Sequence, residues 1–121
     1  ARNGTSIVLV THDLGVVAGF CRDVAVMYTG RVVELSPAPA LFANPMHPYT
    51  KGLLRSVPRL DAASRKERLC PIEGNVPTFR DMPQGCTFHP RCPEAMDICR
   101  GRDPGTYEPE GGRLVRCWRY A

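Results

Sequence analysis

The chain has 121 residues, of which 43% are hydrophobic, and its formal net charge is +4. The length fits one ordinary domain with a modest core, and no apolar run approaches the roughly 20 residues that cross a bilayer. Of the 16 basic residues, 14 are arginines spread along the whole chain, so no block or face indicates binding to nucleic acid. A secretory signal has a positively charged start, a long apolar segment and a small-residue cleavage site. Residues 1–11 have no such pattern, so we expect no export.

Composition divides the chain into two regions. Residues 37–121 hold all 12 prolines and five of the six cysteines, whereas residues 1–36 hold the regular apolar pattern. This predicts the edge of an α/β domain followed by a Pro-rich, Cys-bearing extension. In a reducing cytosol such cysteines are thiols or metal ligands, whereas in a secreted protein they would indicate disulfides. The chain opens at Ala1 and reaches an apolar run almost at once, so we interpret it as part of a longer protein.

The first predicted element is a strand over residues 7–10, Ile-Val-Leu-Val. Its continuous, mostly β-branched composition is typical of a parallel strand covered on both faces. The strand ends at the polar turn formed by residues 11–13, in which Asp13 is a plausible helix N-cap. Apolar residues then recur at helical spacing as far as Cys21, so we expect a short helix after the turn.

A β-hairpin follows this helix. Two β-prone runs, residues 23–28 and 31–35, are separated by Thr29-Gly30, and glycine tolerates the positive φ of a tight hairpin turn. Two short helices are expected at residues 39–43 and 49–56, because the prolines between them prevent one continuous helix. From Pro58 onward we expect loops to dominate.

His12 is the first candidate for chemistry. Ligands of open α/β sheets bind beyond the carboxyl ends of the strands, and His12 lies in a polar turn at such an end. The alternative is structural, with Thr11 and Asp13 capping the helix while His12 faces solvent. Residue types alone leave both interpretations open.

Family resemblance bears on this choice. Residues 10–18, Val-Thr-His-Asp-Leu-Gly-Val-Val-Ala, resemble the switch-histidine segment of ABC transporter ATPases, and residues 28–34 resemble the strand pair that follows it. Three tail segments are similar to the C-terminal region of the dipeptide, oligopeptide and nickel importer ATPases: residues 44–54, 71–77 and 85–93. The resemblance implies an α/β fold, namely the C-terminal fragment of a P-loop ABC ATPase sheet followed by a loop-rich, Cys-containing extension.

The same resemblance implies that His12 contacts the γ-phosphate of ATP, where a positioned donor stabilises the transferring phosphoryl group. Thr11 and Asp13 would shape the turn. The chain has no G-x-x-x-x-G-K-Ser/Thr stretch, no acidic strand end for Mg²⁺ and no Leu-Ser-Gly-Gly signature. We therefore expect the parent protein to hydrolyse ATP with Mg²⁺, and this chain alone not to do so.

The second candidate site consists of four thiols in a tail that lacks the apolar residues for a core of its own, at Cys86, Cys92, Cys99 and Cys117. Four thiols suit a metal or cluster site, whose formation would supply folding energy. Paired disulfides and inert structural cysteines are the alternatives. The family resemblance favours a [4Fe–4S] cluster, with zinc as the other possible metal. Cys21 is expected in the core, and Cys70 as a spare thiol.

Charged and imidazole side chains also lie near these thiols in the sequence. Arg91, Arg100 and Arg116 each adjoin one of the four cysteines, and cations offset the negative charge of a thiolate-ligated cluster. His89 could replace a cysteine as ligand, although a surface or hydrogen-bonding role is the more economical interpretation. His47 precedes a proline at a helix start, so we expect it to be structural.

The family resemblance implies that the chain is the C-terminal portion of the nucleotide-binding subunit of a peptide or nickel importer. Residues 1–36 would be the edge of the ATPase domain, residues 37–69 a helical linker and residues 70–121 the Cys-rich extension. The resemblance implies two membrane permease subunits, a second ATPase subunit, an extracytoplasmic solute-binding protein as indirect partner, and a peripheral place on the cytoplasmic face of the membrane. A free-standing metal-binding or redox-sensing module is the alternative.

Overall fold

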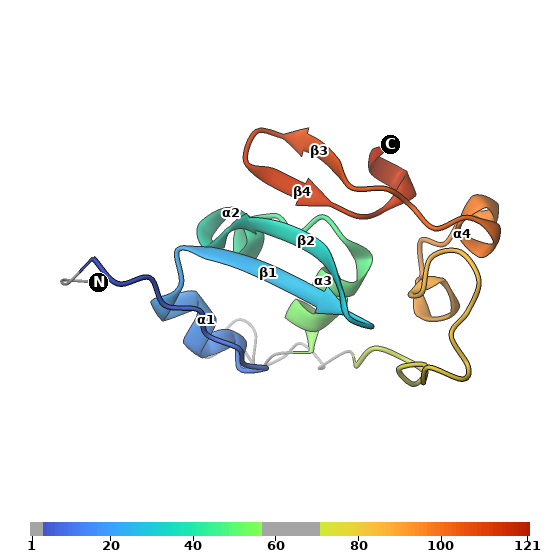
Figure 1. The fold of residues 1–121 in the computed structure, drawn as a ribbon, viewed down its shortest axis with the longest axis horizontal. Coiled ribbons are helices and arrows are strands. Elements are labelled where there is room, and N and C mark those ends of the chain that lie inside the picture. Colours follow the sequence, from blue (N-terminus) through green and yellow to red (C-terminus); the bar gives the residue numbers. More distant parts are fainter. Residues whose placement is uncertain (1–3, 57–70) are drawn as a thin grey trace.

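The computed structural model describes residues 4–56 and 71–121. Cys70, expected to be a spare thiol, lies outside the described residues. Figure 1 shows a small sheet, with the cysteine-bearing segment (residues 86–101) beside the turn that joins strand β1 (Asp23–Tyr28) to strand β2 (Arg31–Pro37). Within the described ranges, no helix has the length and apolar character needed to span a membrane.

The predicted hairpin is present and forms the centre of the fold. Strand β1 (Asp23–Tyr28) pairs antiparallel with β2 (Arg31–Pro37). Thr29 and Gly30 in the turn have φ angles of 49° and 77°, as a tight two-residue hairpin turn requires. Alternate residues of β1 are buried, so one face of the hairpin is apolar and needs a cover.

A second hairpin completes the sheet. Strands β3 (Tyr107–Glu110) and β4 (Arg113–Val115) pair with each other, and β4 also pairs with β2 through Glu34 and Val115. The strand order is β1-β2-β4-β3. The expectation that loops dominate the tail is therefore wrong for these residues. A Gly111-Gly112 turn between β3 and β4 was the available signal, and Gly112 has a φ of 78°.

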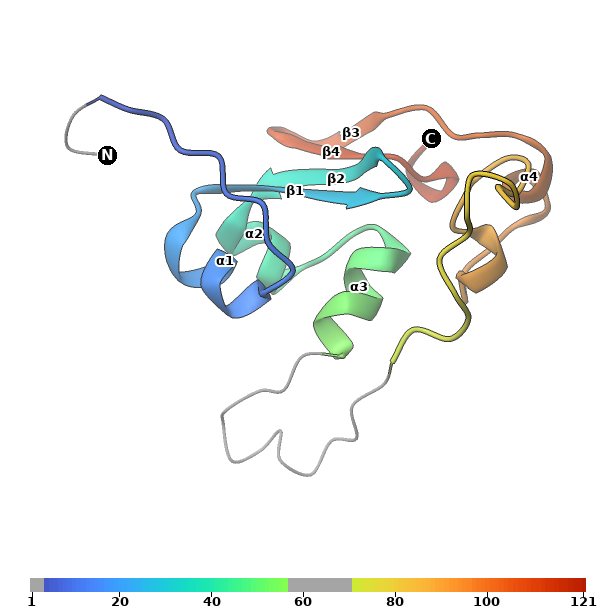
Figure 2. The same cartoon turned by 60° about the horizontal axis from the view of Figure 1, so that its bottom comes forward.

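Three helices pack on one face of the first hairpin (Figure 2). They are α1 (Leu14–Phe20), α2 (Ala38–Ala43) and α3 (Pro48–Arg55), close to the bounds expected from the sequence. A fourth helix, α4 (Asp97–Gly101), lies in the cysteine-bearing segment, which also contains a 3₁₀ turn at His89–Arg91. Another 3₁₀ turn, Trp118–Tyr120, follows β4 near the C-terminus.

The main core lies between this hairpin and the helices. Its buried members come from α1, both strands, α2 and the cysteine-bearing segment: Val17, Val24, Val26, Tyr28, Val33, Ala38, Leu41 and Phe88. The ring of Phe88 packs edge-on against Tyr28 at a centroid distance of 5.2 Å and against Tyr49 at 5.4 Å. One aromatic residue of the tail is thus part of the same core as the first hairpin. Cys21 packs against this core, as expected.

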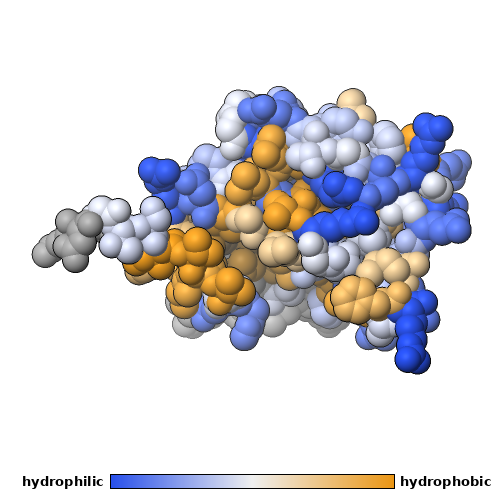
Figure 3. Space-filling model, in the orientation of Figure 1, coloured by the Kyte–Doolittle hydropathy of each residue, from blue (hydrophilic) through white to orange (hydrophobic). Residues whose placement is uncertain are grey.

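Residues 7–10 do not form the predicted strand. They are extended without a partner strand among the described residues, and Val8 and Val10 are 90% and 93% exposed. With Val16 and Phe20 of α1 they form the apolar surface near the N-terminal segment in Figure 3. A parallel strand forms only where a neighbouring strand shares its backbone hydrogen bonds, and no strand of the described sheet, the edge strand β1 included, pairs with residues 7–10.

Candidate functional site

The turn at residues 11–13 is built by two side-chain caps. Asp13 Oδ1 accepts hydrogen bonds from the backbone N–H groups of Gly15 (3.0 Å) and Val16 (3.3 Å), and Thr11 Oγ1 accepts one from Asp13 N (3.0 Å). These bonds confirm Asp13 as the N-cap of α1 and agree with a turn-shaping role for Thr11. His12 is exposed between them. Its imidazole is free to meet a ligand, and its proposed contact with ATP stays a prediction.

The four tail cysteines line one small cavity. Cys86 lies in the loop after residue 85, Cys92 ends the 3₁₀ turn, Cys99 is in α4, and Cys117 follows β4. Thus β4 and α4 bring together thiols that are up to 31 positions apart in the sequence (117 − 86). His47, His89 and Glu94 also contribute to the cavity wall. The sequence grouping of these thiols therefore corresponds to a grouping in space.

Burial sets the protonation of these thiols. It raises the pKa of Cys92 to about 11 and also raises the pKa values of Cys86 and Cys117. In each case backbone hydrogen bonds lower the pKa by less than burial raises it, and neighbouring thiols raise it further. The thiols of Cys86, Cys92 and Cys117 are therefore neutral near pH 7 and become thiolates only when a cation compensates the charge.

The donor set fits a thiolate-bound metal in type and number, because soft sulfur ligands select zinc and iron–sulfur clusters. The cysteines in the described part of the chain are free thiols rather than disulfides. However, no group of three or more His, Cys, Asp or Glu among the described residues is arranged to hold a metal ion. The cavity measures about 10 Å³, room for about one water molecule, so a cluster would require the four side chains to move apart.

The two histidines beside the cavity already have hydrogen-bond partners. His89 Nδ1 lies 2.8 Å from the carbonyl oxygen of Cys86, in agreement with a hydrogen-bonding role. His47 caps α3: its Nδ1 accepts a hydrogen bond from Tyr49 N at 3.0 Å, which confirms the structural role expected for it. Burial lowers the pKa of His47 to about 4, and a hydrogen bond to the backbone of Arg116 opposes this effect only in part.

Polar contacts attach the cysteine-bearing segment to the β1–β2 turn. Thr29 Oγ1 and Thr87 Oγ1 are 2.8 Å apart. Arg91 Nη1 donates to Tyr28 Oη at 3.3 Å, and the guanidinium carbon lies 5.9 Å from the centroid of the Tyr28 ring. Residues 86–92 are therefore held on the first hairpin by these polar contacts and by the packing of Phe88 in the main core.

A buried ion pair, which the sequence analysis missed, joins β2 to β4. Glu34 is 1% exposed and accepts from Arg113 Nη2 at 3.1 Å. The same carboxylate accepts from the backbone N–H groups of Met46 and His47, the latter at 2.8 Å. Arg113 also donates to the carbonyl oxygen of Asn44 at 2.7 Å. The available signal was a lone carboxylate within the β-prone run of β2, because a buried charge needs a buried partner.

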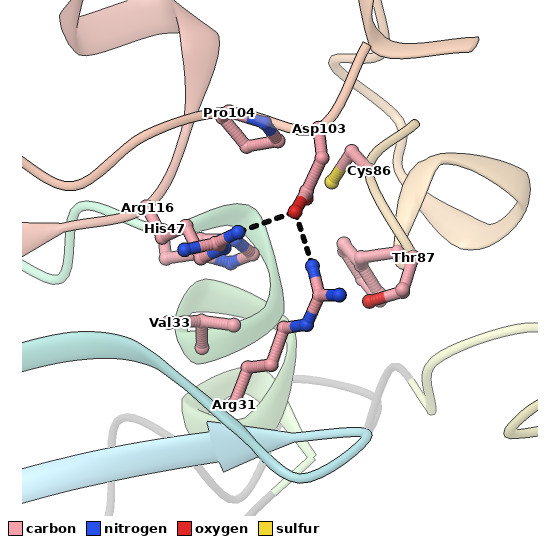
Figure 4. Close-up of a pocket in the computed structure, with 9 residues that line it drawn as sticks. Arg31, Val33, His47, Cys86, Thr87, Asp103, Pro104 and Arg116 are labelled. Atoms are coloured by element: carbon pink, nitrogen blue, oxygen red, sulfur yellow. Dashed lines mark hydrogen bonds and ion pairs between the residues drawn. The ribbon is translucent and has the colours of Figure 1, made fainter. Parts of the chain in front are cut away.

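A second ionic group lies at the edge of the site (Figure 4). One carboxylate oxygen of Asp103 accepts hydrogen bonds from both Arg31 Nη1 and Arg116 Nη2. The three side chains line a cavity of about 10 Å³ that Cys86 also borders. No local sequence pattern pointed to Asp103, which lies in the loop after α4.

Over half of the chain matches a known protein family. Residues 33–99 match the family model described as "Oligopeptide/dipeptide transporter, C-terminal region". This stretch contains β2 from residue 33 onward, α2, α3 and three of the four cavity-lining cysteines.

Curated relatives extend the similarity to nearly the whole chain. The chain is 49% identical to the oligopeptide transport ATP-binding protein AppD of Bacillus subtilis, over 96% of this chain and 35% of the relative. It is 48% identical to OppD of Salmonella typhimurium and 49% identical to OppD of Escherichia coli, both with the same descriptive name, over 95% of this chain and 33% of each relative. The chain thus spans about a third of the length of these proteins.

Proposed function

Because this chain belongs to the family of the oligopeptide/dipeptide transporter C-terminal region, we propose that it is the last part of the ATP-binding subunit of an ABC importer for peptides. The observation that carries this proposal is its identity of 48–49% with relatives named oligopeptide transport ATP-binding proteins. These names favour peptides over nickel chelates as cargo and a transporter subunit over a free-standing metal-binding module.

In this proposal the full-length subunit works on the cytoplasmic face of the membrane. It pairs with a second ATPase subunit and binds two membrane permease subunits, which an extracytoplasmic solute-binding protein supplies with peptide. Residues 1–36 belong to the edge of the ATPase domain, residues 37–69 form the linker and residues 70–121 the extension. The pairing of β2 with β4 supports an extension that rests against the preceding residues.

His12 would act on ATP bound with Mg²⁺ by the remainder of the subunit. The imidazole of His12 is exposed and lies between Thr11 and Asp13, whose side chains cap the turn. From this position it can donate a hydrogen bond to the γ-phosphate and orient the attacking water. The chain provides this donor, and the phosphate loop and metal-binding acid would come from elsewhere in the subunit.

The test of this role is the steady-state ATPase rate of the full-length subunit. His12→Ala should lower turnover by roughly 10²-fold or more while ATP binding stays largely intact. Arg22→Ala, at an exposed position after α1, is the matched control and should leave turnover unchanged. Turnover of His12→Ala within about twofold of the unmodified protein would remove His12 from the chemistry.

The four tail thiols are proposed to hold a [4Fe–4S] cluster. The support is a cavity lined by four free thiols, together with their donor type. When bound, such a cluster can accept and release one electron. The residues of the chain contribute the ligands, and the buried wall around them limits access of water. His89 orients the loop through its bond to the Cys86 carbonyl.

Metal analysis of the anaerobically purified full-length subunit tests this assignment. Iron and acid-labile sulfide in equal amounts are expected, and serine in place of any one of the four cysteines should bleach the protein. Cys21→Ser is the control and should keep the colour, because Cys21 packs against the main core outside the cavity. One zinc per chain would replace the cluster by a zinc site, and a metal-free protein with two disulfides would rule out both.

A further inference from the structure

The strongest unassigned feature is the way in which the turn around His12 is held in place. Residues 7–10, which lead into this turn, are exposed and pair with no strand of the described sheet. The imidazole of His12 is also exposed, so its direction depends on the backbone of the turn rather than on packing. The turn is therefore fixed from the side of α1, which packs on the first hairpin (Figure 2).

A series of contacts connects the turn to the core. Val17 of α1 is 8% exposed and belongs to the main core. Its backbone N–H donates a hydrogen bond to the carbonyl oxygen of Asp13 at 3.2 Å. The carboxylate of Asp13 accepts hydrogen bonds from Gly15 N and Val16 N, and Asp13 N donates to Thr11 Oγ1. Asp13 thus joins the core to the turn through both its backbone and its side chain.

Gly15 leaves room for this carboxylate. A Cβ atom at residue 15 would lie 3.2 Å from Asp13 Oδ1, which is closer than ordinary van der Waals contact. The oxygen could move away only by lengthening its bonds to the backbone N–H groups of Gly15 and Val16. At Gly19, which is also exposed and in the same helix, a Cβ atom would meet no described atom within 4 Å. The missing side chain at residue 15 therefore serves the cap, whereas the one at residue 19 does not.

We propose that Asp13, with the space that Gly15 provides, holds His12 in the position from which it acts on ATP. This inference rests on the role of His12 in the proposed function. Asp13 and Gly15 are positioning residues and do not contact ATP themselves. A shift of the imidazole by about 1 Å is enough to weaken its bond to the phosphoryl group, since rate depends steeply on such alignment. Loss of the cap should therefore slow turnover without weakening the binding of ATP.

The experiment compares variants of the full-length subunit by steady-state ATPase kinetics and by ATP binding. Asp13→Ala removes the cap and should lower kcat by about tenfold with the KM for ATP unchanged. Asp13→Asn keeps an acceptor for the two backbone N–H groups and should restore kcat to within about twofold of the unmodified protein. Gly15→Ala should lower kcat by about threefold. Gly19→Ala, which gains the same helix propensity without touching the cap, is the matched control and should leave kcat unchanged.

A double variant shows whether Asp13 acts through His12. If it does, Asp13→Ala should change kcat by less than about twofold once His12→Ala is present. A loss of undiminished size in that background would overturn the proposal, because Asp13 would then act independently of the imidazole. Equal losses in Asp13→Asn and Asp13→Ala would also overturn it, because the charge and not the cap would then matter. Equal losses in Gly15→Ala and Gly19→Ala would remove Gly15 from the account.

The same measurements separate this inference from the proposed function. If His12→Ala lowers turnover by roughly 10²-fold and Asp13→Ala does not lower it, the role of His12 stands and the positioning role of Asp13 fails. If His12→Ala keeps turnover within about twofold of the unmodified protein, the role of His12 fails, and this inference fails with it.

Discussion

The two ends of this chain bury their residues in opposite ways. Residues 7–10 are continuously apolar and yet stay exposed, whereas residues 86–117 contain few apolar residues and place Phe88 and Val115 at 2% and 1% exposure. The tail is held by directional contacts, including the buried Glu34–Arg113 pair, and the N-terminal segment has no such partner in the described sheet. Order in this fold therefore depends on available partners more than on local hydrophobicity.

The largest expected effect comes from removing the ion pair that joins the two hairpins. Glu34→Ala leaves Arg113 charged and buried and removes the acceptor of two backbone N–H groups, so it should lower the free energy of unfolding by about 3–5 kcal/mol. Urea titration of the 121-residue chain, followed by circular dichroism, measures this change. Asp23→Ala removes an exposed pair with Arg22 and should cost less than about 1 kcal/mol. Equal costs for the two variants would show that the tail is not held by the buried pair.

The second-largest effect is expected when the pH is lowered. Folding keeps His47 neutral down to about pH 4, whereas the unfolded imidazole takes up a proton near its ordinary pKa of 6.5. Stability should therefore fall as the pH drops from about 7 to 4, by about 3 kcal/mol in total from this group. The pH dependence of the unfolding free energy should be less steep in His47→Asn, which keeps a side-chain N-cap acceptor. Identical slopes for the two proteins between pH 7 and 4 would contradict the buried neutral state of His47.

The smallest effect is expected at the other end of the chain. Val8→Ala and Val10→Ala should each change the stability of the 121-residue chain by less than about 0.5 kcal/mol, because both side chains are already exposed. Val26→Ala, buried in β1, is the matched control and should cost about 1–3 kcal/mol. In the full-length subunit, where we expect a buried strand at residues 7–10, the first two substitutions should cost as much as the third. Equal stability effects at all three positions in the short chain would mean that residues 7–10 are buried there.

The turns, helix caps and helix ends could be predicted from the sequence. The Thr29-Gly30 turn, the Asp13 cap and the proline breaks around α3 each have a physical cause within a few residues. The prediction of a strand at residues 7–10 was wrong for this chain. A continuous apolar run indicates that a segment can be buried, but it does not indicate which other segment would cover it. Whether residues 7–10 form a strand depends on a partner strand, and no strand of the described sheet pairs with them.

Only part of the candidate site could be predicted from the sequence. The four cysteines were identified from their grouping in the sequence, and their common cavity agrees with that grouping. The partners of Glu34 and Asp103 lie up to 79 and 72 positions away, respectively, and no local pattern encodes such distant pairs. The role of His12 rests on the family resemblance, since its local structure is only an exposed turn.

The central claim is that protein contacts, and not a metal alone, hold the cysteine-bearing tail on the first hairpin. Hydrogen exchange of the full-length subunit after removal of metal by a chelator under anaerobic conditions tests it most directly. The amide of Arg116, bonded to the Val33 carbonyl, and the amide of Cys86, bonded to the Cys99 carbonyl, both at 2.8 Å, should stay protected together with β1 and β2. Exchange of both amides at the rate of an unstructured chain, while β1 and β2 stay protected, would contradict the claim.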